Sequence, residues 1–96
     1  STTKGAILAF TRSMALDLAP KGIRINSVSP GAIATERLVD HFGSIKAAED
    51  ALSPLHPLGH IGHSSDIANA VGFLASNKSK FMTGADLVVD GGYTAK

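Results

Sequence analysis

The segment from Ile23 to Thr35 constrains the fold of this chain more than any other stretch. It begins as a short, β-branched run and stops at Pro30-Gly31, where a regular strand cannot continue. In open parallel α/β sheets, ligands bind just outside the carboxyl ends of the strands. The loop that follows Ser29 is therefore the first place to look for a bound small molecule.

Composition narrows the possible classes of protein. The chain has 96 residues, which is enough for one small domain at most. Of these residues, 44% are hydrophobic and 18% are charged, which excludes a disordered chain or a coiled coil. Basic and acidic residues are well mixed and the net charge is +1, so no nucleic-acid surface is indicated. No apolar run approaches the length of a membrane span. The absence of cysteine excludes disulfides and thiolate zinc sites and fits a reducing, cytoplasmic location.

The pattern of apolar residues and chain breakers predicts an α/β order of elements. The expected elements are a helix over residues 1–19, a strand over 23–29, two short helices within 36–63, a helix over 65–76 and a strand over 85–90. A strand, a crossover and a second strand predict a parallel, right-handed βαβ unit. We call residues 36–63 the lid segment, because loops of this length in compact domains usually cover binding sites.

Helical spacing and capping residues refine this prediction. The apolar stripe expected on the first helix is Ile7, Phe10, Met14 and Leu18. Its other apolar residues extend the surface so far around the helix that we expect partners on two sides. The expected cap residues are Ser1, Thr2 and Thr3 for the first helix, Thr35 and Ser44 for the lid helices, and Ser64 for the last helix.

Four motifs in order along the chain match one known family. They are Ser1 to Ala6, Gly22 to Gly31, Pro57 to Gly59 with Asp66 to Ala68 and Phe73 to Ser76, and Thr83-Gly84 with Val89 to Gly92. Over essentially its whole length, the sequence resembles the C-terminal third to half of a classical-type short-chain dehydrogenase/reductase.

The resemblance implies an α/β fold that is the C-terminal part of a doubly wound, parallel Rossmann-type sheet. Residues 1–96 would form a single partial domain, with the natural C-terminus close to Lys96. The family's catalytic tyrosine would stand directly before Ser1, and its glycine-rich dinucleotide loop and catalytic serine would lie further upstream. We therefore expect this chain to be a fragment of a longer enzyme and inactive alone.

Lys4 is the clearest candidate for a catalytic residue. In the family's Tyr-x-x-x-Lys motif, a tyrosine and a lysine four residues apart share one face of a helix. A tyrosine with an ordinary pKa of about 10 is a poor base at neutral pH, and a nearby ammonium group lowers that pKa. The resemblance also implies that Lys4 hydrogen-bonds the ribose of the cofactor. The alternative is a solvated lysine near the start of a helix.

Pro30, Gly31, Ile33 and Thr35 are the candidate cofactor-binding residues. Pro30 ends the strand, and Gly31 allows backbone to approach a ligand closely. The resemblance implies that the backbone of Ile33 pairs with the nicotinamide carboxamide and that the Thr35 hydroxyl binds nearby. From spacing alone, an ordinary strand-end turn with a helix cap at Thr35 is an equal alternative.

The four histidines raise the question of a metal site. They are His41, His56, His60 and His63. Gly59 and Gly62 oppose a helix that would present the rings of His60 and His63 on one face, and no acidic residue lies within residues 56–63. We therefore predict no metal site and expect solvent-exposed loop histidines. His60 stands where the family often has arginine, and Ser64-Ser65 stands where it often has Pro-Glu.

The resemblance implies hydride transfer between NAD or NADP and a secondary alcohol or ketone, in a cytoplasmic homotetramer. Four lid residues are expected to line the substrate pocket: Leu38, Val39, Phe42 and Leu55. They could equally well only pack the lid onto the domain. The alternative function is a truncated, non-catalytic remnant that acts through its subunit-association surfaces. The choice between NAD and NADP depends on a strand that this sequence does not contain.

Overall fold

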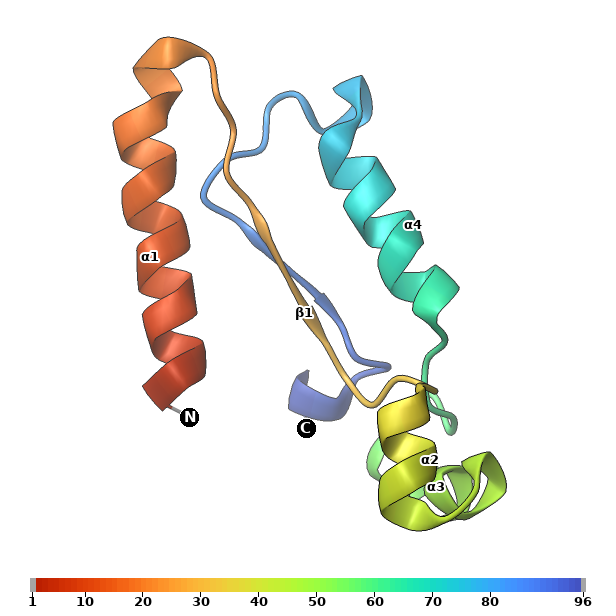
Figure 1. Cartoon of the computed structure of the whole chain (residues 1–96). Coiled ribbons are helices and arrows are strands. Elements are labelled where there is room, and N and C mark those ends of the chain that lie inside the picture. The colour runs from red at the N-terminus through yellow and green to blue at the C-terminus, as the bar shows by residue number, and fades with distance from the viewer. Residues whose placement is uncertain (1, 96) are drawn as a thin grey trace. The chain divides into compact units, whose positions relative to one another are not determined.

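The computed structural model describes residues 2–95, with side chains from Lys4 onward. The predicted caps Ser1 to Thr3 and the expected end near Lys96 fall outside the described atoms. The helices and strands are α1 (Thr2–Leu18), β1 (Ser27–Pro30), α2 (Glu36–Phe42), α3 (Ile45–Leu52), α4 (Ser64–Ala75) and β2 (Asp86–Val89). Short 3₁₀ turns are η1 (Ala19–Lys21), η2 (Ser53–Leu55), η3 (Asn77–Ser79) and η4 (Tyr93–Ala95). Figure 1 colours this order from red to blue. No helix within the described residues is both long and apolar enough to cross a membrane.

The strands β1 and β2 pair in a two-stranded sheet. The Ser27 N–H donates to the Ala85 carbonyl (2.9 Å), and the Gly31 N–H donates to the Val89 carbonyl (3.0 Å). Donor and acceptor advance along the chain in the same direction, so the strands are parallel, as expected for a βαβ unit. The α/β class expected from the sequence is confirmed.

The chain divides into two compact units, each of which contains half of this strand pair. The first unit comprises residues 2–28 with Ala70–Leu87, and the second comprises Ser29–Asn69 with residues 88–95. The buried apolar residue of the first unit is Ala15, and those of the second are Ala48 and Ile61.

The strand β1 begins later than the sequence predicts. Over residues 23–26, side chains supply part of the hydrogen bonding that a regular ladder would provide. The Ile25 N–H donates to Thr83 Oγ1 (3.1 Å), and Asn26 Oδ1 accepts from the Ala85 N–H (3.0 Å). The apolar β-branched pattern indicated an extended backbone correctly, but it could not show where backbone pairing starts.

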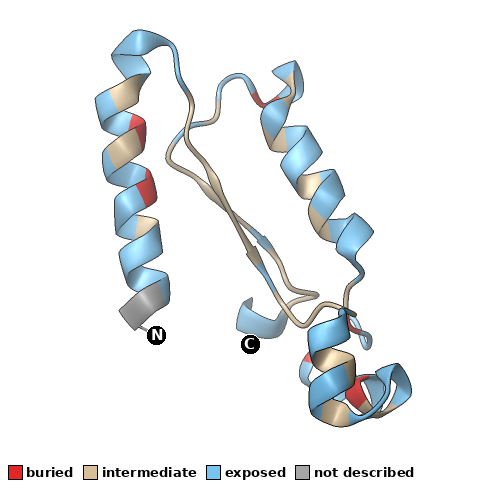
Figure 2. Ribbon diagram, in the orientation of Figure 1, coloured by how far each residue is buried: buried red, intermediate tan, exposed pale blue. Residues whose placement is uncertain are grey.

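The helix α1 covers only half of the stripe predicted for it. Ile7 and Phe10 of that stripe are 53% and 65% exposed. The less exposed residues of the helix are Leu8, Thr11, Met14, Ala15 and Leu18. Of these five, Thr11 and Ala15 are buried, and Figure 2 draws buried residues in red. The buried Thr11 hydroxyl donates to the Ile7 carbonyl (2.8 Å), which explains how a polar residue occupies the packed face. Of the predicted stripe, Met14 and Leu18 therefore lie on the packed face, whereas Ile7 and Phe10 do not.

Arg24 donates hydrogen bonds to carbonyl groups at the end of α4 and in the segment that follows it. Its Nη1 donates to the Ser79 carbonyl (2.9 Å) and the Met82 carbonyl (3.2 Å). Its Nη2 donates to the Leu74 carbonyl (2.9 Å) and the Ser76 carbonyl (3.3 Å). Of these four carbonyls, that of Leu74 belongs to the last turn of α4 and the others follow the helix, so one planar guanidinium connects the end of α4 to the segment after it.

The two helices predicted within the lid segment are present as α2 and α3, which pack against each other. Ser44 caps α3, since its side chain accepts from the Ala47 N–H (3.0 Å). Thr35 occupies the N-cap position of α2, but its side chain makes no capping hydrogen bond. The prediction of a cap was therefore confirmed for Ser44 and wrong for Thr35.

The helix α4 starts one residue earlier than predicted. Ser64 is its first residue rather than its cap. The Asp66 carboxylate reaches back and accepts from the His63 N–H (2.8 Å). An acidic side chain in the first turn supplies the acceptor there and also suits the positive end of the helix dipole.

Replacing Arg24 should destabilise the protein. We expect Arg24→Met to lower the free energy of unfolding by about 3 kcal/mol, because it removes the hydrogen bonds of a charged group to four carbonyls. Arg24→Lys should recover less than half of this loss, since an ammonium cannot span the same set of carbonyls. Urea unfolding of the intact protein measures the effect, with Arg12→Met on the exposed face of α1 as the matched control. Equal midpoints for the two methionine variants would contradict this role.

Candidate functional site

The end of β1 is crowded at Gly31. A Cβ atom on this residue would lie 2.9 Å from Asp90 Cα and 3.1 Å from His56 Nε2. Real Cβ atoms do not approach backbone carbon this closely, so only glycine fits without movement of the neighbouring chain. The predicted close approach at Gly31 is present, and the groups that it meets are the turn after β2 and a histidine of the lid segment.

The backbone after Gly31 is held on one side only. Ile33 forms an isolated parallel bridge with Gly62, in which Gly62 N–H donates to the Ala32 carbonyl (2.8 Å) and Ala34 N–H donates to the Gly62 carbonyl (2.9 Å). In a planar trans peptide, the N–H of Ile33 points opposite to the Ala32 carbonyl, and thus away from Gly62.

The Ile33 N–H and carbonyl take no part in these bonds and have no partner within residues 2–95. Each is a strong hydrogen-bonding group. This edge of the loop can therefore pair with an amide-like group that offers one donor and one acceptor.

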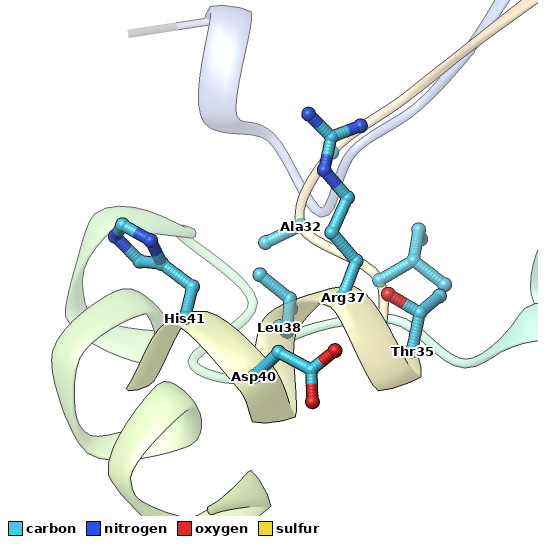
Figure 3. Close-up of a pocket in the computed structure, with 8 residues that line it drawn as sticks. Ala32, Thr35, Arg37, Leu38, Asp40 and His41 are labelled. Atoms are coloured by element: carbon cyan, nitrogen blue, oxygen red, sulfur yellow. The ribbon is translucent and has the colours of Figure 1, made fainter. Parts of the chain in front are cut away.

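A cavity of about 550 Å³ lies beside this loop. It is lined by Gly31, Ala32, Ile33, Thr35, Arg37, Leu38, Asp40 and His41 (Figure 3). Leu38 is the apolar lining residue that α2 contributes, whereas the helix also brings a guanidinium, a carboxylate and an imidazole. In Figure 3 the Arg37 side chain extends away from α2, and the Asp40 carboxylate takes a different direction. The cavity thus joins the strand-end backbone to polar groups of the first lid helix.

The structure brings most of the candidate residues into the second unit. Pro30, Gly31, Ile33 and Thr35 follow one another at the strand end, and three of them line the cavity, together with Leu38. The other three candidate substrate residues do not line it: Val39, Phe42 and Leu55. Val39 and Phe42 lie half-buried on α2, and Leu55 is 42% exposed in η2. Lys4 is exposed on α1 and belongs to the first unit.

The histidines do not share one environment. His41, His60 and His63 are exposed as predicted, whereas His56 is only 4% exposed. The prediction for His56 was wrong because its ring fills a space between the lid segment and the strand end. No group of three or more histidine, cysteine or acidic side chains that could hold a metal gathers within residues 2–95. The residues that flank His56, Leu55 and Pro57, are both exposed, so its sequence neighbours do not indicate its burial.

Comparison with known proteins identifies the family. The profile of a family described as "Enoyl-(Acyl carrier protein) reductase" matches residues 1–94. The NADP-dependent (R)-specific alcohol dehydrogenase of Lentilactobacillus kefiri is 47% identical over 100 residues, which cover all of this chain and 38% of that protein. This chain belongs to the short-chain dehydrogenase/reductase family. The cyclopentanol dehydrogenase of Comamonas testosteroni is 44% identical over 93 residues, or 97% of this chain and 37% of that protein.

Solved short-chain dehydrogenase/reductase structures have the same fold. A short-chain dehydrogenase family protein from Francisella tularensis subsp. tularensis SCHU S4 superimposes with a TM-score of 0.87 at 41% identity, over 99% of this chain and 43% of that one. ElxO with NADP bound gives a TM-score of 0.87 at 40% identity, over 99% of this chain and 38% of its own. The chain therefore spans between 37% and 43% of the length of these four proteins. The resemblance seen in the sequence is confirmed.

The crowding at Gly31 yields a direct test. Gly31→Ala should lower the free energy of unfolding by about 2 kcal/mol, because the new methyl group forces the Asp90 backbone or the His56 ring to move. Gly72→Ala is the matched control, since a Cβ at Gly72 meets nothing within 4 Å and alanine favours a helix. Thermal or urea unfolding of the intact protein measures both. A Gly31→Ala protein as stable as the control would show that the close approach is not maintained in solution.

Proposed function

We propose that this chain is the C-terminal part of an NAD(P)-dependent oxidoreductase that transfers hydride between nicotinamide and a secondary alcohol or ketone. Family membership and the names of the relatives support the reaction class. The observation that carries the proposal is the open backbone edge at Ile33. A nicotinamide carboxamide offers one donor and one acceptor, which is what the N–H and carbonyl of this residue need.

The cofactor-binding residues would be Lys4, Pro30, Gly31, Ile33 and Thr35. Pro30 and Gly31 set the end of β1, and the exposed Thr35 hydroxyl, which caps no helix, is available to the carboxamide or a phosphate oxygen. When bound, the nicotinamide would accept or supply the hydride. Either NAD or NADP fits the proposal: ElxO was solved with NADP bound, and 4-hydroxyisoleucine dehydrogenase with NADH.

Lys4 would act with a tyrosine of the polypeptide upstream of this sequence. Its ammonium would lower the pKa of the phenol, which then takes the proton from the alcohol or returns it to the ketone. Lys4 would also bind the ribose of the cofactor.

Residues 36–63 would close over a small alcohol or ketone as the lid of a single partial domain formed by residues 1–96. Leu38 lines the cavity next to the strand end and so supports an apolar contact with the substrate. Val39, Phe42 and Leu55 would complete the pocket when substrate is bound. Alcohol dehydrogenases among the relatives, which are named for cyclopentanol and cyclohexanol, support a neutral, apolar substrate.

The intact protein would be a cytoplasmic homotetramer. The exposed side chains of Ile7 and Phe10 on α1 support an association surface there, since large apolar groups are normally covered in the assembled state. This same exposed face supports the alternative function, in which the chain is a non-catalytic remnant that only associates with subunits.

Replacement of Lys4 tests the catalytic role. In the intact enzyme, Lys4→Met should lower kcat for alcohol oxidation by about 100-fold, and its activity should rise only at higher pH, because the phenol keeps a pKa closer to its ordinary value. Lys21→Met, an exposed lysine in η1, is the matched control. The measurement is a pH–rate profile at saturating cofactor. An unchanged profile and an unchanged kcat would remove Lys4 from the mechanism.

The intact mass of the natural protein separates enzyme from remnant. We expect a mass two to three times that of this chain, because the relatives are longer by about that factor. The purified 96-residue chain should show no oxidation of reduced cofactor above the blank with a ketone. A natural product of this size alone would favour the remnant, and ketone-dependent turnover by the short chain would refute the assignment of the catalytic tyrosine to an upstream segment.

A further inference from the structure

His56 uses both ring nitrogens in hydrogen bonds to backbone. Its Nδ1 lies 2.8 Å from the Leu52 carbonyl, and its Nε2 lies 3.3 Å from the Ala32 nitrogen. A carbonyl only accepts and a backbone N–H only donates, so Nδ1 carries the proton and Nε2 is the acceptor. The ring is therefore a neutral imidazole in one tautomer, and its two bonds run in opposite directions.

These two bonds connect the lid segment to the strand-end loop. Leu52 is the last residue of α3, and Ala32 stands between Gly31 and Ile33. The ring is also enclosed: a Cβ on Gly31 would lie 3.1 Å from Nε2, and one on Gly91 would lie 3.6 Å from His56 Cβ. The ring of Tyr93 packs beside it at a centroid distance of 5.3 Å.

The backbone of Ala32 is fixed at both of its polar groups. Its N–H donates to His56 Nε2, and its carbonyl accepts from Gly62 N–H at 2.8 Å. Together these bonds restrain the peptide planes on both sides of Ala32. The second of these planes carries the Ile33 N–H, so its direction depends on them.

We propose that His56 is a positioning residue for the nicotinamide loop, which holds the Ile33 backbone in the direction that the carboxamide requires. This inference rests on the proposed function of the loop. A loop that already has its bound conformation loses less conformational freedom when ligand binds, so the gain is in cofactor affinity. His56 does not touch the reacting atoms in this role, and the chemical step is left to Lys4 and the upstream tyrosine.

Two side chains of different length distinguish this role from simple packing. The amide of His56→Gln extends as far as Nε2 and can accept from Ala32 N–H, whereas that of His56→Asn extends only as far as Nδ1. In the intact enzyme we expect His56→Asn to weaken binding of NADH or NADPH about tenfold, with kcat at saturating cofactor changed less than threefold. His56→Gln should stay within threefold of the wild type in both. The control is His63→Asn at an exposed histidine.

Cofactor affinity is measured by the fluorescence of the reduced nicotinamide, and the melting temperature is measured in parallel. Equal affinities for the asparagine, glutamine and wild-type proteins would overturn the role of His56. So would losses of cofactor affinity that occur only in proportion to a lower melting temperature. A wild-type enzyme that binds neither cofactor would refute the proposed function as well. Should the asparagine variant not fold, hydrogen exchange at the Ala32 amide of the cofactor-free wild type decides: protection supports the bond, and free exchange overturns it.

Discussion

The parallel pairing of β1 with β2 is the constraint from which the site follows. Each strand has four residues, so the ladder supplies few hydrogen bonds and side chains supplement it. Ser27 Oγ donates to Asp86 Oδ1 (2.8 Å), and Asn26 binds backbone on the approach to β2. A slip of one residue would break these bonds and turn every side chain to the other face. The register therefore places Gly31, the donor of the last ladder bond, against the turn after β2.

Sequence patterns predicted what depends on neighbouring residues in the chain. The order of helices and strands, the stop at Pro30-Gly31 and the cap at Ser44 all follow from local chemistry, and the structure contains each of them. The packed face of α1 was not predictable in the same way. That face is chosen by what lies opposite, and a Cβ at Gly84 would come within 3.5 Å of Ala15. Small residues at such a contact give a weaker periodic signal than the larger side chains of Ile7 and Phe10.

His56 illustrates a second limit of sequence patterns. A histidine between leucine and proline carries no periodic signal, and its burial depends on acceptors and donors that other segments supply. Leu52 is near in sequence, but Ala32 lies 24 residues away. Only the folded chain shows that both ring nitrogens are satisfied, which is the condition for burying the ring without a large penalty. Family resemblance gave the site residues at the strand end but did not include this one.

In one part of the candidate site the binding groups belong to the backbone, and in the other part they belong to a side chain. At Ile33 the groups that can bind a ligand are the backbone N–H and carbonyl, and every residue except proline provides both. The residues that matter for binding are therefore those that orient this backbone. Gly62 is one of these, since its N–H donates to the Ala32 carbonyl (2.8 Å) and its carbonyl accepts from the Ala34 N–H (2.9 Å). Lys4 is the opposite case, because only the charge of its side chain could alter the pKa of a phenol. Under the proposed function, substitutions in the loop should act through affinity for the cofactor, and substitutions at Lys4 through both the rate of the chemical step and the binding of the ribose.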